Sequence, residues 1–92
     1  MNRSEIQRFR DIPNVGVAIE KSFKDLGMHR PGELTGKDPY QLYKDLCRVT
    51  NKRHDPCVLD IFISAVKYMQ GEPAKKWWEF TAERKKYLND SA

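Results

Sequence analysis

IPNVGVAIEKSFKDLG, residues 12–27, joins a tight turn directly to a helical pattern. Pro13, Asn14 and Gly16 are turn residues, since proline fixes φ, asparagine tolerates a positive φ and glycine adopts either sign. Apolar residues then recur at helical spacing until Gly27, which supplies a left-handed residue to end the helix. Such a turn leaves unpaired amides at the helix N-terminus, where the positive end of the helix dipole lies. The stretch therefore predicts a small anion site, and nucleic-acid phosphate is the anion that a basic intracellular domain most often meets.

Two segments resemble known sequence families. Residues 12–27, together with Glu33-Leu34 and residues 38–42 (DPYQL), look like a helix-hairpin-helix DNA-binding module. Residues 52–60, KRHDPCVLD, are similar to the signature of the bacterial "pathogenicity locus" family, small helix-hairpin-helix proteins sometimes labelled mitomycin resistance proteins. Together the two matches span about residues 11–71. The resemblance implies a helix-hairpin-helix fold and a bacterial stress-related or DNA-related setting.

Length and composition are typical of a small intracellular domain. At 92 residues the chain is expected to form one domain, residues 1–92, with a core at about 4–71 and a tryptophan-rich helix at about 74–89. The sequence has no apolar run that suits a membrane span and no apolar stretch that suits a secretory signal. Two cysteines, with no other sign of an oxidising compartment, favour reduced thiols in the cytoplasm. The excess of 17 Lys and Arg over 13 Asp and Glu gives a net charge of +4, which permits a polyanionic partner.

Helical periodicity recurs between the breakers and strand alternation does not, so an all-α fold is expected, a compact bundle of about five helices. Start signals are clearest at Asp38-Pro39 and Asp55-Pro56, where a carboxylate caps free amides and proline fits the first helical position. The helix after Asp55 is apolar around more than half of its circumference, which predicts a central position. The helices are expected at about 4–10, with Ser4 as N-cap, at 17–26, 39–49, 56–69 and 74–89, with one further turn at 31–34. The third helix is expected to present Tyr40, Leu42, Tyr43, Leu46 and Val49 as its apolar face.

The hairpin is the first candidate binding site. In the functional interpretation, backbone amides of the turn contact one or two phosphates, and two lysines farther along the helix reach the same sugar-phosphate backbone. The residues assigned to this site are Asn14, Val15, Gly16, Val17, Ala18, Lys21 and Lys24. Asn14 stands where helix-hairpin-helix proteins commonly have a first glycine. The alternative is a structural turn that joins two packed helices.

A second basic cluster comprises Arg48, Lys52 and Arg53, with His54 beside them. It is interpreted as a secondary phosphate-contact surface. The alternative is a solvated connection between helices, in which Arg48 faces the C-terminal dipole of the preceding helix.

His54 and Cys57, with Cys47 and Asp60 nearby, are residue types found in metal sites and nucleophilic dyads. The spacing Cys47-x6-His54-x2-Cys57 matches none of the common zinc patterns, and no third orienting group accompanies a Cys–His dyad. An N-cap at Asp55 and small core residues at the cysteines explain the same sequence. The sequence therefore predicts no metal, no cofactor and no catalytic residue, which describes a non-enzymatic protein.

Aromatic residues and lysines interleave in the C-terminal helix, which suits either base stacking or a protein contact. Trp77 and Trp78 are adjacent and would point about 100° apart on a helix, so Trp78 is predicted to be an exposed partner-contact residue. Two functions follow. The leading one is sequence-nonspecific DNA binding through the hairpin amides and lysines; the alternative is a protein-interaction or homo-oligomeric module that uses the tryptophan-rich helix. Neither a membrane nor a small-molecule substrate is expected as a partner.

Overall fold

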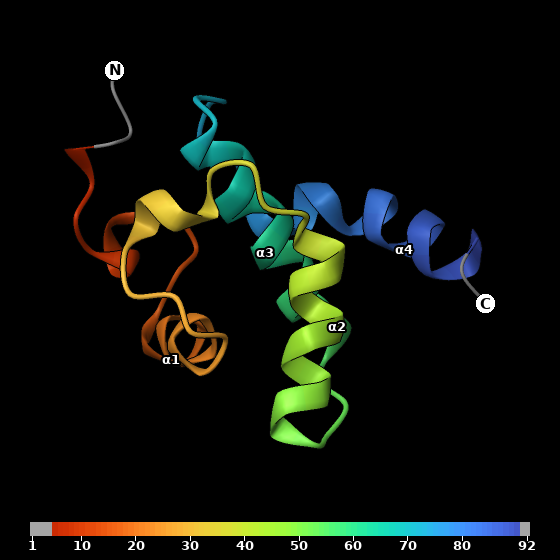
Figure 1. The fold of residues 1–92 in the computed structure, drawn as a ribbon. Helices are drawn as coiled ribbons and strands as arrows, with labels where there is room; N and C mark the ends of the chain where they lie inside the picture. Colours follow the sequence, from red (N-terminus) through yellow and green to blue (C-terminus); the bar gives the residue numbers. More distant parts are fainter. Residues whose placement is uncertain (1–4, 91–92) are drawn as a thin grey trace.

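The computed structural model describes residues 5–90, which contain four α-helices, short 3-10 helices and the loops that connect them (Figure 1). The α-helices are α1 (Val17–Asp25), α2 (Pro39–Thr50), α3 (Pro56–Met69) and α4 (Thr81–Asp90), and the 3-10 helices are η2 (Phe9–Asp11), η3 (Pro31–Leu34) and η4 (Trp77–Phe80). No strand occurs among residues 5–90, so the all-α prediction is confirmed. No helix in this range is both long enough and apolar enough to cross a bilayer.

The central element is α3, as predicted. Eight of its residues are buried, and it packs against α2, α4, η3 and η4. Through the core runs a row of aromatic rings, Phe9, Phe23 and Phe62, with centroids 5.0 and 5.1 Å apart. Figure 1 shows α2 in front of α3, with α1 on one side and α4 leading away on the other.

The predicted helix boundaries are confirmed where they depend on local chemistry. Asp38 and Asp55 each accept a hydrogen bond, 2.9 Å long, from the amide two residues on, and each precedes the proline that opens its helix. Helix α2 ends at Asn51, which has a φ of 53°. Gly27 has a φ of 87° just beyond α1.

The expected helix at 4–10 is wrong. Residues 6–8 are not helical, and only the short η2 follows them; Ser4, its expected N-cap, lies outside the described residues. Phe9 and Ile12 are both fully buried, and Ile12 is extended with a ψ of 132°. Because the residue before a proline is disfavoured in the helical region, the chain must leave η2 at Ile12, and too few residues remain for a stable α-helix.

The expected helix at 74–89 also differs, because residues 72–76 are not helical and α4 begins only at Thr81. The Glu79 carboxylate accepts a 2.8 Å hydrogen bond from the amide of Lys76, which starts η4 at Trp77 instead. Phe80, at the end of η4, is 7% exposed and belongs to the core, so the core extends beyond residue 71.

Val49 is 49% exposed, contrary to the apolar face expected for α2. The position that continues the buried stripe one turn after Leu46 is Thr50, whose hydroxyl donates to the Leu46 carbonyl and lies 2.7 Å from Nε2 of His54. The C-terminal end of α2 is therefore held by the hydrogen bonds of Thr50 instead of by an apolar contact of Val49.

Candidate functional site

The hairpin before α1 is anchored to the rest of the molecule by Asn14. Its φ is 72°, the left-handed conformation predicted for this residue. Its side-chain amide donates to Ser64 Oγ on α3 at 3.0 Å and to the carbonyl of Lys75 at 2.7 Å. The side chain thus points inward, away from any ligand that approaches the turn. Val15 differs from its expected role, because its amide donates to the Ile12 carbonyl at 3.1 Å and its side chain is buried; it is not a free donor.

The N-terminus of α1 is open to solvent. Gly16 is the N-cap, and as a glycine it brings no side chain to cap the amides behind it. A Cβ built on Gly16 would meet no heavy atom within 4 Å, and the side chain of Val17 is 67% exposed. Ala18 is exposed as well. The first amides of an α-helix have no acceptor within the helix, and the dipole adds positive potential there, so this end can hold an anion.

The acidic residues of α1 are each paired with a basic one. Glu20 lies 3.5 Å from Arg10, and Asp25 lies 3.0 Å from Lys21 in an i,i+4 pair. Lys24 is exposed on the same helix. Since each carboxylate has a cation beside it, the acids of α1 do not leave a net negative charge near the open helix end.

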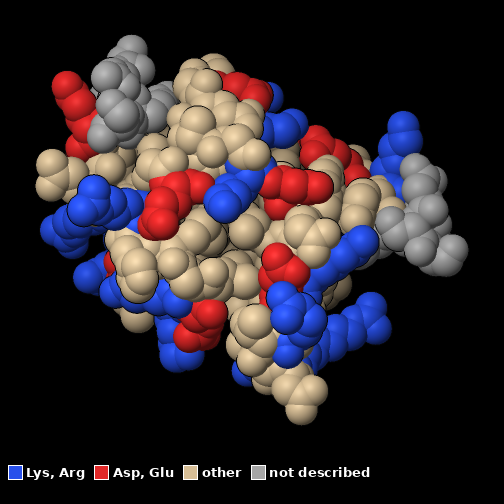
Figure 2. All heavy atoms as spheres, viewed as in Figure 1, with Lys and Arg blue, Asp and Glu red and all other residues tan. Residues whose placement is uncertain are grey.

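A groove of about 510 Å³ separates α1 from the connection between α2 and α3. Lys21 lines it from α1, and Lys52 and His54 line it from the connection. The rest of its wall is formed by Ala18, Ile19, Ser22, Asp25, Thr50 and Val58. Ala18 lines the groove and also lies in the open first turn of α1, so the groove begins where the open amides end. Figure 2 shows Lys and Arg side chains gathered near the end of α2, and acidic ones among the basic ones elsewhere on this face.

Of the secondary basic patch, Lys52 alone is among the groove residues. Arg48 lies 3.5 Å from Asp45 on its own helix, so its charge is partly satisfied within α2. Arg53 is exposed in the connection. The structure therefore brings Lys52 together with Lys21, and it places Arg48 and Arg53 outside the groove lining.

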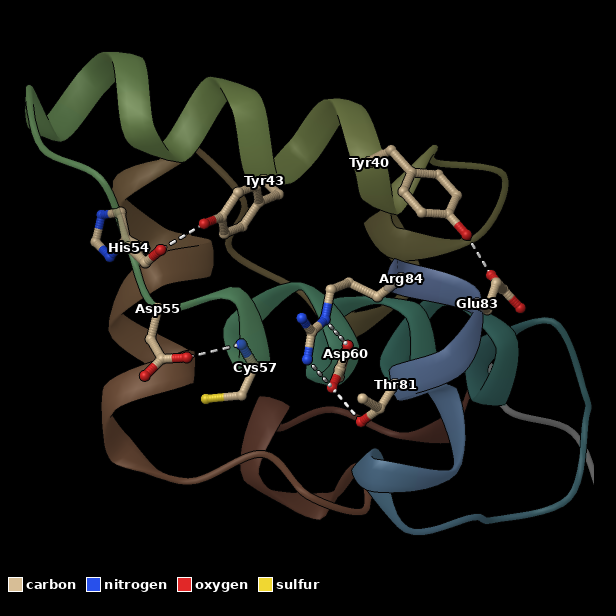
Figure 3. A network of polar contacts seen from close by, with 9 residues as sticks. All are labelled: Tyr40, Tyr43, His54, Asp55, Cys57, Asp60, Thr81, Glu83 and Arg84. Atoms are coloured by element: carbon tan, nitrogen blue, oxygen red, sulfur yellow. Dashed lines mark hydrogen bonds and ion pairs between the residues drawn. The ribbon is translucent and has the colours of Figure 1, made fainter. Parts of the chain in front are cut away.

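His54 and Cys57 have structural contacts (Figure 3). The Thr50 hydroxyl donates to the Leu46 carbonyl, so its oxygen accepts from Nε2–H of His54. The His54 carbonyl in turn accepts a hydrogen bond from the Tyr43 hydroxyl. Burial raises the pKa of the Cys57 thiol, and the hydrogen bond with Asp55 adds to this effect, which keeps the thiol protonated.

A buried ion pair joins α3 to α4 (Figure 3). Asp60 is completely buried; its Oδ1 lies 2.9 Å from Nε of Arg84, and its Oδ2 accepts a 2.7 Å hydrogen bond from the Thr81 hydroxyl. Sequence reasoning grouped Asp60 with the cysteines and missed this pair. The available signal was a carboxylate inside the most apolar helix, since a buried charge requires a partner.

The aromatic residues of η4 lie beside the hairpin's anchor at Lys75. Trp78 is 53% exposed, as predicted, and Trp77 is half-buried. Their rings pack edge to face with centroids 5.6 Å apart, and Nζ of Lys76 lies 5.1 Å from the Trp78 ring centroid. An exposed indole next to lysines thus lies three residues beyond the carbonyl to which the hairpin is bonded.

Comparison with known proteins identifies relatives along nearly the whole chain. Residues 2–86 match the Cdd1 family, described as "Pathogenicity locus". The chain is 35% identical over 88 residues to the "Mitomycin resistance protein McrB" of Streptomyces lavendulae, and the alignment covers 96% of this chain and 84% of that protein. No solved structure matches the chain significantly. The match to the family extends over well more than half of the sequence, and the chain therefore belongs to the Pathogenicity locus family (Cdd1).

Proposed function

We propose that this protein is a non-enzymatic, cytoplasmic DNA-binding protein that holds the phosphate backbone without reading base sequence. The proposal treats η2, the turn at 12–16 and α1 as a helix-hairpin-helix module in which η2 replaces the first helix. The observation that carries it is the open, uncapped N-terminus of α1, which continues into a groove lined by Lys21 and Lys52.

The proposed contact is electrostatic. A phosphate oxygen accepts hydrogen bonds from the amides of Gly16, Val17 and Ala18, and the helix dipole favours its negative charge. Lys21 and Lys52 then face the next phosphates along the groove, where phosphate replaces Asp25 as the partner of Lys21. Lys24 adds a further exposed cation on α1, and binding of the lysines releases counterions. Such contacts fix the position of DNA and carry no sequence information.

The substitution Gly16→Asp tests the contact at its centre. Gly16 has a φ of −103° and open space around its Cα, so an aspartate fits, and as an N-cap it is expected to preserve or slightly raise stability. The introduced carboxylate accepts hydrogen bonds from the free amides of α1 and repels phosphate. We expect the affinity for a fluorescent DNA duplex, measured by anisotropy at low salt, to fall by about tenfold or more while the melting temperature is maintained.

The matched control is Gly32→Asp, which adds the same charge at another exposed glycine with open space around it. We expect it to retain most of the affinity. In a separate variant, Lys21→Gln with Lys24→Gln should reduce the slope of log affinity against log salt by about 2. Undetectable duplex binding by the unmodified protein at low salt, or an equal loss in Gly32→Asp, would contradict the proposal.

The relative from Streptomyces lavendulae suggests a cellular readout. We extend the proposal to mitomycin resistance and expect bacteria that express the chain to survive mitomycin better than bacteria that express the Gly16→Asp variant at equal levels. Equal survival with the unmodified chain and with Gly16→Asp would show that resistance does not depend on the phosphate contact.

A protein-interaction module is the second candidate, favoured by the 53% exposure of Trp78. It predicts a dimer or a larger complex that Trp78→Ala disperses while the helical circular dichroism spectrum is unchanged. Light scattering measures the mass of the unmodified protein and of the Trp78→Ala variant. If both are monomers, Trp78 makes no contact between copies of the chain, which contradicts a homo-oligomeric module.

A further inference from the structure

We propose that Trp78 is a stacking site for an unpaired DNA base, so that the preferred ligand has a single-stranded stretch at the phosphates held by α1. This inference rests on the proposed function and names its class of ligand. Base stacking on an exposed aromatic ring is tolerant of sequence, in keeping with a protein that holds the backbone.

The first argument is position. The Asn14 side chain donates to the carbonyl of Lys75 at 2.7 Å, which fixes the segment before η4 against the hairpin. In Figure 3 this segment, in blue, passes beside the brown hairpin. Trp78 follows Lys75 by three residues, so the two Cα atoms are separated by at most about 11 Å. A strand whose phosphate lies at Gly16 therefore reaches Trp78 within a few nucleotides.

The second argument is the state of the ring. Trp77 packs edge to face with Trp78 at an interplanar angle of 87°, which limits the orientations open to the exposed indole. The contact of the Lys76 ammonium with the ring is a cation–π contact at the surface, worth little to the free protein. We expect a base to displace this ammonium, which then pairs with the phosphate of the same nucleotide.

The third argument is charge, and it favours nucleic acid over a protein partner. Lys75 and Lys76 are exposed directly before η4. Of the nearby acids, Glu79 is engaged by the amide of Lys76 at 2.8 Å, and Glu72 has contacts of its own. The charge in contact with the ring is thus the Lys76 ammonium, and a cation at the stacking face favours a polyanion.

The test uses tryptophan fluorescence, since Trp77 and Trp78 are the two tryptophans of the chain. Trp77→Phe leaves Trp78 as the only indole, and Trp78→Phe leaves Trp77 as the matched control. On titration at low salt with an oligothymidylate of about 12 nucleotides, we expect strong quenching in the first variant and weak quenching in the second. Trp78→Ala should weaken binding of this strand roughly tenfold, with a smaller effect on a blunt duplex.

The outcomes separate this inference from the proposed function. If Gly16→Asp abolishes binding of the strand and of the duplex while Trp78→Ala changes neither, stacking is overturned and the phosphate contact stands. If Trp78 is quenched equally in Gly16→Asp, stacking stands and the phosphate contact fails. Absence of any binding overturns both. Dispersal of an oligomer by Trp78→Ala, with unchanged affinity for DNA, assigns the indole to a protein contact and overturns stacking.

Discussion

A single residue, Asn14, fixes the shape of the hairpin in two ways. Its backbone takes the left-handed conformation, which costs most residues with a Cβ about 1–2 kcal/mol. Its side chain bonds to Ser64 and to the carbonyl of Lys75, which ties two distant segments to the turn. Asparagine suits this position because it combines tolerance of positive φ with two tertiary hydrogen bonds.

Two substitutions of Asn14 separate these contributions. Asn14→Ala loses both hydrogen bonds and leaves a Cβ in the left-handed region, and we expect it to lower the free energy of unfolding by about 2–4 kcal/mol. Asn14→Gly loses the hydrogen bonds alone and should be about 1 kcal/mol less damaging. Urea unfolding measures both. An alanine variant as stable as the glycine variant would show that the positive φ carries no cost here.

At the level of elements, the pair between Asp60 on α3 and Arg84 on α4 is the main polar link of the C-terminal helix to the core. Removing Arg84 leaves a buried carboxylate without its cation. We expect Arg84→Met to lower the free energy of unfolding by about 3–5 kcal/mol. Asp60→Leu combined with Arg84→Met should recover most of that loss, because both charges are then absent.

The matched control is Lys85→Met, which removes the same charge from the next, exposed residue of α4. Its effect should stay within about 0.5 kcal/mol. Urea unfolding followed by circular dichroism measures the three variants. The single variant Asp60→Leu, measured in the same way, completes the double-mutant cycle, and strict additivity of its effect and that of Arg84→Met in the double variant would show that the two residues are not coupled.

The elements that the sequence predicts are those specified by neighbouring residues. The starts of α2 and α3 follow from an aspartate and a proline that act within one turn, and the left-handed residues Asn14 and Gly27 follow from backbone chemistry. The exposed N-terminus of α1 was also predictable, since Gly16 provides no cap.

The remaining features depend on residues far apart in the chain. Arg84 lies 24 positions after Asp60, and no local pattern pairs them. The inward direction of the Asn14 side chain depends on Lys75, 61 positions away. The loss of the expected first helix combines the local effect of Pro13 on Ile12 with the burial of Phe9 and Ile12 in a core that residues far along the chain complete.

For the whole molecule, stability should depend on pH through three carboxylates with lowered pKa values. Hydrogen bonds from the amides of His29 and Arg30 lower the pKa of Glu33, and one from the amide of Cys57 lowers that of Asp55. Burial acts to raise the pKa of Glu83, but its hydrogen bonds with Tyr40 and Lys67 outweigh this effect and lower it.

A lowered pKa in the folded state means that the unfolded chain binds protons more readily. The stabilisation from these carboxylates is therefore complete above the usual carboxyl values of 3.8 for Asp and 4.5 for Glu, and it is lost as the pH falls through the lower folded values. We expect the melting temperature to hold steady between about pH 6 and 5 and then to fall steadily to about pH 2.5. Thermal unfolding followed by circular dichroism tests this in the triple variant Glu33→Gln, Asp55→Asn and Glu83→Gln. Its melting temperature should be lower between about pH 6 and 5 and should fall less as the pH drops below about 5. An acid limb as steep as that of the unmodified protein would assign the loss to other groups.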